Sequence, residues 1–200
     1  MKITPIAAVL ALALCGAAQA QDGAASAAQR DASQQHRIAE GLKSGQLSVR
    51  EAGRLEREQA RLEEMQARAL RDGGGLDPRE QDRLEADLNS LNQEIRGYKH
   101  DGKNADPNEI SARRLAELVQ RSANQQERIA RGLRAGELSA EEASRLERGQ
   151  ARVSGMLADA TGDGYVGGAE QSAIAEQQQR QGQRIYARNN NDRDRNRHGY

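Results

Sequence analysis

The 200-residue sequence contains no tryptophan or phenylalanine, four tyrosines, three prolines and a single cysteine. So few aromatic rings cannot line a deep substrate cavity, and they offer no platforms on which nucleic-acid bases could stack. Basic and acidic residues each number 30, so the net charge of zero supplies no global field that would attract a polyanion. We therefore expect no nucleic-acid partner.

The residue patterns that usually mark an active site are also missing. The three histidines, His36, His100 and His198, lie far apart in the chain, and none pairs with another histidine or a cysteine at metal-ligand spacing. The sequence has no Gly-x-Ser-x-Gly motif and no phosphate-binding glycine loop. Its many acidic residues are expected to form solvated helix faces. The sequence thus predicts a protein that is not an enzyme.

The first 20 residues have the layout of a secretory signal peptide. They combine a positive start, an apolar run over 6–14 and small residues at Ala18 and Ala20, so we predict a signal peptide over 1–20 that is cleaved before Gln21. The apolar run is too short to span a bilayer, and no later stretch is apolar enough. The only cysteine lies within this leader, so the mature chain has no disulfide. We expect a periplasmic or secreted protein without a membrane span.

An internal repeat is the strongest signal in the rest of the chain. Residues 34–61 match residues 125–152 at a shift of 91 positions, with 19 of 28 pairs identical. The sequence therefore predicts two related units, a linker rich in Gly, Asn and Asp, and a low-complexity tail that is expected to be disordered. Their bounds are 28–101 for unit 1, 102–114 for the linker, 115–188 for unit 2 and 189–200 for the tail.

Each unit is predicted to contain three helices joined by two tight turns. Arg, Glu, Gln, Ala and Leu, which favour helix, dominate both units, and apolar residues recur at heptad spacing. The predicted fold class is therefore all-α. Because these apolar seams are narrow, the helices must pack on each other, on a protein partner or on a second copy. The clearest seam consists of Leu84, Leu88, Leu91, Ile95 and Tyr98.

Four predicted turns share the pattern Gly-x-aliphatic-x-x-x-Glu, at 45–51, 74–80, 136–142 and 164–170. Helix capping explains the first three. Gly45 and Gly136 can end a helix at positive φ. The next helix then opens with a Ser-x-x-Glu or Asp-x-x-Glu capping box. The boxes are Ser48 with Glu51, Asp77 with Glu80 and Ser139 with Glu142.

The fourth turn belongs to the stretch 159–170, DATGDGYVGGAE, which resembles the calcium loop of an EF-hand. The resemblance places Gly164 at the sharp turn, and Thr161 stands where Asp or Asn is usual. With only three carboxylates, we expect a dissociation constant near ~10⁻⁴ M. Residues 40–51, 69–80 and 131–142 lack the oxygens and are predicted to be degenerate relatives. The calcium ligands implied are the side chains of Asp159, Thr161, Asp163 and Glu170 and the carbonyl of Tyr165.

Two functions are compatible with these features. The first is an exported, non-enzymatic calcium-binding helical protein that uses the ion for structure or sensing. The alternative is a calcium-independent periplasmic helical chaperone or envelope adaptor, since Leu-Ser-x-x-Glu at 47–51 and 138–142 is similar to the Leu-Thr-x-x-Gln motifs of small helical periplasmic stress chaperones. The QQxRIxxG pattern at 34–41 and 125–132 is similar to that of exported helical repeat proteins of proteobacteria. That similarity does not choose between the two functions.

Overall fold

The computed structural model describes the backbone of residues 7–71, 77–106 and 108–197, and the side chains of those between 22 and 190. The described residues form six helices and no strand, which confirms the predicted all-α class and gives each repeat three helices. The helices are α1 (Ala7–Ser44), α2 (Val49–Arg71), α3 (Pro78–Lys99), α4 (Ile110–Arg134), α5 (Ala140–Ala160) and α6 (Gly168–Arg197).

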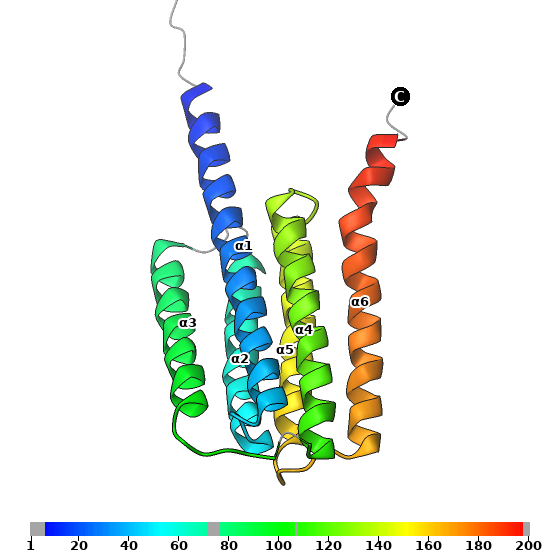
Figure 1. Ribbon diagram of the computed structural model, residues 1–200. Helices are drawn as coiled ribbons and strands as arrows, with labels where there is room; N and C mark the ends of the chain where they lie inside the picture. Colours follow the sequence, from blue (N-terminus) through cyan, green and yellow to red (C-terminus); the bar gives the residue numbers. More distant parts are fainter. Residues whose placement is uncertain (1–6, 72–76, 107, 198–200) are drawn as a thin grey trace, which may run out of the picture.

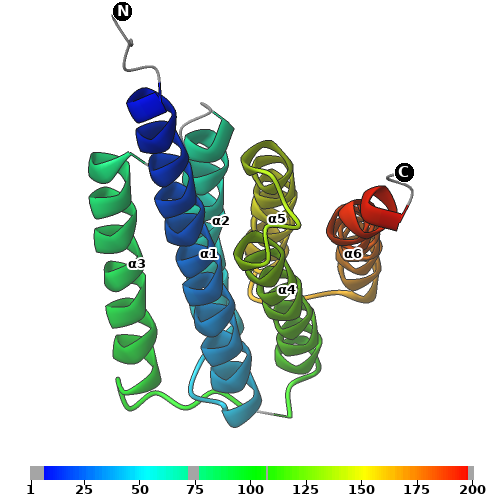
Figure 2. The same cartoon turned by 90° about the horizontal axis from the view of Figure 1, so that it is seen from above.

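The helices form a four-helix centre with one further helix on each flank (Figures 1 and 2). α1 packs along α4, and α2 packs along α5, so both central pairs join one repeat to the other. α3 contacts α1 and α2 on one side, whereas α6 contacts α4 and α5 on the opposite side. The two repeats therefore form one six-helix body, an arrangement that the sequence did not predict.

The packing follows the internal repeat. A shift of 91 positions carries α1 onto α4 and α2 onto α5. His36 Nε2 lies 2.9 Å from Oε1 of Glu127, the residue 91 positions later, so α1 and α4 meet at equivalent points and an approximate two-fold axis relates the repeats. Equivalent bonds also hold the flanking helices: Gln34 Nε2 donates to the Leu88 carbonyl at 2.8 Å, and Gln125 Nε2 donates to the Gln178 carbonyl at 2.6 Å.

The predicted heptad seams supply the apolar core. The seam of α3 is buried against α1 and α2, apart from the half-buried Tyr98. In α4 the seam is buried as well, although Ser122 and Gln126 interrupt it with polar groups. The structure thus confirms the helical periodicity and shows that the narrow seams are covered within the chain. The seven-residue seams of α2 and α5 are equally buried, at Leu55, Leu62 and Ala69 and at Leu146, Val153 and Ala160.

Some helix ends differ from the predicted bounds. α4 begins at Ile110 and so includes the last five residues of the segment predicted as a linker, 102–114. α6 continues to Arg197, through most of 189–200. Residues 198–200, the side chains of the predicted leader and residues 72–76, where the second predicted turn begins, lie outside what the structure describes. In the part of the chain that it does describe, no helix is long and apolar enough to cross a membrane.

Candidate functional site

The loop between α5 and α6 has the backbone layout of a helix–loop–helix. α5 ends at Ala160, in the second of the twelve positions 159–170, and α6 begins at Gly168, so Glu170 lies in its first turn. Gly164 has a φ of +88°, which glycine adopts without strain. Val166 is fully buried, and its N–H donates to a serine hydroxyl in the first turn of α4 at 3.2 Å. The loop is therefore a tight, anchored turn.

Three of the predicted calcium ligands of this loop make hydrogen bonds within the loop or to the end of α5. Asp159 is exposed at the end of α5, whereas Thr161 is buried against α2 and its Oγ1 donates to a carbonyl three residues earlier at 2.7 Å. Oδ1 of Asp163 accepts the N–H of Tyr165 at 2.8 Å, and Oε2 of Glu170 accepts the N–H three residues before it at 2.8 Å. Among the described residues, no three His, Cys, Asp or Glu side chains are placed to hold a metal ion.

Two arginines from other helices bind the carbonyl oxygens of the same loop. Nη2 of Arg50, in α2, donates to the carbonyl of Asp163 at 2.7 Å. Nη1 of Arg114, in α4, donates to the carbonyl of Val166 at 3.1 Å. These bonds fasten the loop to both repeats, and their positive charges oppose a further cation by Coulomb repulsion.

The four turns share one capping contact, which accounts for their common spacing. In each, the glutamate Oε2 accepts the N–H of the residue three positions earlier. The predicted boxes at Asp77 and Ser139 are complete, and Ser48 Oγ likewise accepts the N–H of Glu51 at 3.3 Å. At the fourth turn, the residue at the cap is a glycine, so only the glutamate half of the box exists. The four distances are 2.9 Å for Glu51, 3.0 Å for Glu80, 3.1 Å for Glu142 and 2.8 Å for Glu170.

A basic groove of about 760 Å³ runs between α2 and α5 on the outer face of the four-helix centre. Small or apolar side chains, Ala60, Ala151 and Met65, line it together with arginines of both helices and one glutamate. We call it the arginine groove. Arg61 and Arg68 pair with neighbouring glutamates, but the other three arginines make no ion pair within the described residues. These three are Arg57, Arg148 and Arg152.

The interior of the four-helix centre is acidic, which the sequence analysis did not predict. Asp31, Glu56, Glu63 and Glu147 are fully buried, so the expectation that acidic residues form solvated helix faces is wrong for these four. Burial raises the pKa of Asp31 to about 7 and the pKa values of Glu56 and Glu147 to about 8. Burial also raises the pKa of Glu63 well above its ordinary value, and the nearby carboxyls of Asp31 and Glu147 raise it further. We call these four residues the acid core.

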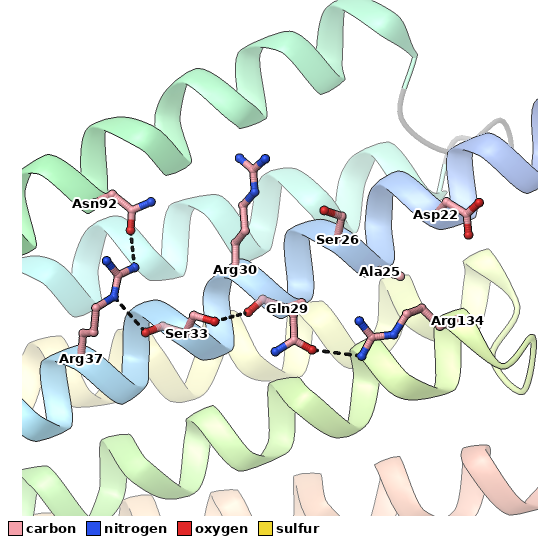
Figure 3. Close-up of a pocket in the computed structure, with 9 residues that line it drawn as sticks. All are labelled: Asp22, Ala25, Ser26, Gln29, Arg30, Ser33, Arg37, Asn92 and Arg134. Carbon is pink, nitrogen blue, oxygen red and sulfur yellow. Dashed lines mark hydrogen bonds between the residues drawn. The ribbon is translucent and has the colours of Figure 1, made fainter.

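A second polar cavity, of about 420 Å³, lies beside α1 (Figure 3). Its arginines already have partners. Arg134 donates to Oε1 of Gln29 at 3.0 Å, and Arg37 donates to the side chain of Asn92. Because these hydrogen bonds occupy the guanidinium groups, this cavity offers a ligand fewer free charges than the arginine groove.

Compared with known proteins, the chain matches no family model, and neither a curated protein nor a solved structure gives a significant match. The function must therefore be argued from the sites themselves.

Proposed function

We propose that this chain is a non-enzymatic adaptor protein whose arginine groove binds an acidic α-helix of a partner protein. The observation that supports this function most directly is the set of unpaired arginines, Arg57, Arg148 and Arg152, above a floor of small side chains. Guanidinium groups form charge-assisted, often bidentate, hydrogen bonds with carboxylates. An acidic surface is therefore the natural complement of this groove.

The shape of the groove favours a helix as the occupant. Ala60 and Ala151 lie at its floor and leave room for the close approach of another backbone. The residues of α2 that line the groove extend from Arg57 to Arg68. At 1.5 Å per residue this is about 17 Å, or roughly three helical turns. A helix with an apolar stripe flanked by glutamates would cover the floor and pair with both rims.

A bare phosphate polymer fits the groove less well. Such a chain would bind the guanidinium groups, but it would leave the side chains of Met65, Ala60 and Ala151 exposed to water. The burial of these side chains would then contribute nothing to binding. The few aromatic residues of the chain also provide no stacking surface for bases. These features separate a polypeptide partner from a polyanion, and the binding experiment includes both.

The proposed function predicts binding of a synthetic acidic helix. The probe is a fluorescent 20-residue peptide with an Ala/Leu stripe flanked by Glu, and its matched control carries Gln in place of Glu. We expect anisotropy titrations to show binding of the Glu peptide that added salt weakens. The double substitution Arg57→Gln/Arg148→Gln should lower affinity about tenfold, or ~1.4 kcal/mol. The control Arg79→Gln/Arg83→Gln, on the exposed surface of α3, should not change it.

Two results would overturn this function. One is equal affinity of the wild-type protein and the groove variant for the Glu peptide. The other is saturable binding of inorganic polyphosphate without binding of the peptide.

We further propose that the predicted leader directs export. The protein recovered from the periplasm should then have the mass of residues 21–200. A mass that includes residues 1–20 would contradict this.

Calcium binding at 159–170 remains a second candidate, supported by Gly164 at positive φ and by the three carboxylates of the loop. For a calcium ion to bind, Glu170 must release the N–H that it caps and Thr161 must turn away from its carbonyl partner. We therefore expect weak affinity, near ~10⁻⁴ M. Calorimetric titration with calcium should give about one site per chain, and Glu170→Gln should abolish it. Glu142→Gln, which removes the same cap from a loop without the other oxygens, is the matched control.

A further inference from the structure

The acid core lies at the centre of the body, where both repeats meet. Asp31 comes from α1, Glu56 and Glu63 come from α2, and Glu147 comes from α5, 91 positions after Glu56. Nε2 of Gln126, in α4, donates both to Oε1 of Glu63 at 3.2 Å and to Oε2 of Glu147 at 2.9 Å. One amide thus bridges two carboxyls that belong to different repeats.

No buried cation accompanies these carboxyls in the described part of the chain. The charged residues that are buried there are the four acids alone. α4 presents Ser122 and Gln126 to the interior, and α6 presents glutamines, whereas α3 presents leucines and an isoleucine. The nearest charged pair on the α1–α4 contact, His36 with Glu127, is half-buried and satisfied by its own bond. Nothing in the described interior therefore offsets four negative charges.

The buried side chains of the described residues have many unpartnered acceptors but a single unpartnered nitrogen donor, Gln59 Nε2. Both carboxyl oxygens of Glu56 have no hydrogen-bond partner in the described residues, and one oxygen each of Asp31, Glu63 and Glu147 also has none. Several buried amide oxygens beside them are unpartnered acceptors too. A proton on each carboxyl would convert an acceptor into a donor and supply what the centre lacks. The unpartnered amide oxygens include those of Gln35, Gln66, Gln126 and Gln150.

We propose that protons on the acid core act as a switch: the six-helix body is closed while these carboxyls are protonated, and it loosens at the α2–α5 contact when they ionise. α2 and α5 carry three of the four acids, so repulsion between Glu63 and Glu147 acts directly across their contact. Ionised carboxyls also draw water, which the closed centre does not admit without separation of the helices.

The sign of the pH dependence follows from the direction of the pKa shifts. The folded pKa values of all four acids lie above those of the unfolded chain. The unfolded chain therefore releases its protons first as pH rises, and the stabilisation present below pH ~4 is lost progressively up to pH 7–8. Each such carboxyl changes the unfolding constant by up to about tenfold per pH unit within this window.

The test is urea unfolding of the full chain, followed by circular dichroism from pH 5 to pH 9. We expect the wild-type midpoint to fall steadily as pH rises towards 8, and hydrogen exchange at pH 8 to increase most in α2 and α5. The neutral variant Asp31→Asn/Glu56→Gln/Glu63→Gln/Glu147→Gln should keep a nearly constant midpoint. The matched control, Glu58→Gln/Glu64→Gln/Glu141→Gln, removes acids near the surface of the same helices and should keep the wild-type slope.

A flat wild-type profile, or a neutral variant that retains the wild-type slope, would overturn the proposal. If the neutral variant does not fold, the single variant Glu56→Gln decides, because its carboxyl makes no hydrogen bond that the substitution could break. This variant should reduce the change of the urea midpoint with pH by the contribution of one carboxyl. All titrations are run with and without EDTA. A slope that EDTA alone changes would assign the acid core to a metal ion and refute the proton switch.

Discussion

The contact between Gly53 and Thr161 allows a sharp test of how α2 packs against the end of α5. A Cβ atom added to Gly53 would lie 1.7 Å from Oγ1 and 2.7 Å from Cβ of Thr161. Rotation about χ1 could move the hydroxyl, but the Cβ of Thr161 is fixed to its backbone. Gly53→Ala must therefore displace the start of the loop that Arg50 and Glu170 hold in place. At Gly155, in α5, an added Cβ would meet nothing within 4 Å, so this glycine is the matched control.

The two substitutions should change stability in opposite directions. Alanine in a helix interior is favoured over glycine by about 1 kcal/mol, so Gly155→Ala should stabilise the protein by about 0.5–1 kcal/mol. At Gly53 the same gain is opposed by an overpacking cost of typically 1–3 kcal/mol, and the very close approach to Thr161 places it at the upper end. We therefore expect a net loss of about 1–2 kcal/mol, or several degrees in Tm. Urea unfolding monitored by circular dichroism measures both, and a Gly53→Ala protein as stable as Gly155→Ala would refute the packing argument.

Two further predictions concern caps and core. Ser139→Ala removes the hydroxyl that accepts the N–H of Glu142, so it should cost about 1 kcal/mol of unfolding free energy, whereas Ser90→Ala on the exposed face of α3 should cost far less. Equal losses in the two serine variants would contradict the capping role. Leu118→Ala empties a fully buried position in α4 and should cost about 2–5 kcal/mol, while Ile110→Ala, at a side chain 59% exposed, should stay within about 0.5 kcal/mol. Thermal unfolding of each pair gives the comparison, and similar Tm values for both would place Leu118 outside the core.

The helices and turns could be predicted because their signals are local. Heptad apolar steps and the Ser-x-x-Glu and Asp-x-x-Glu boxes depend on residues within one or two turns of each other, and the structure contains the corresponding helices and caps. Which helices pair is not a local property. Each seam is narrow and similar to the others, so the pairing of α1 with α4 depends on long-range contacts, of which that between His36 and Glu127 is one.

The acid core was not predicted from the sequence, because the acidic side chains of the helices were expected to be solvated. In α2, Glu56, Gln59, Glu63 and Gln66 follow each other at steps of 3, 4 and 3, which is the spacing of a buried helix seam. A polar stripe at that spacing, next to an apolar one, indicates a polar interior. The loop at 159–170 shows the opposite case: Thr161 fits the ligand pattern by position, yet its hydroxyl caps α5, because contacts with α2 determine where the side chain points.

The acid core and the arginine groove arise from one arrangement of charge on α2. This helix carries six arginines and five glutamates, but its exposed positions are all arginine, whereas Glu56 and Glu63 point inward. With those two carboxyls protonated, six arginines face three ionised glutamates instead of five, so a chain of zero net charge presents a distinctly basic surface. Ionisation of the acid core would place negative charge beneath the same arginines and weaken their attraction for an acidic helix. The proton switch therefore acts on the groove through charge as well as through packing, because both belong to the same two helices.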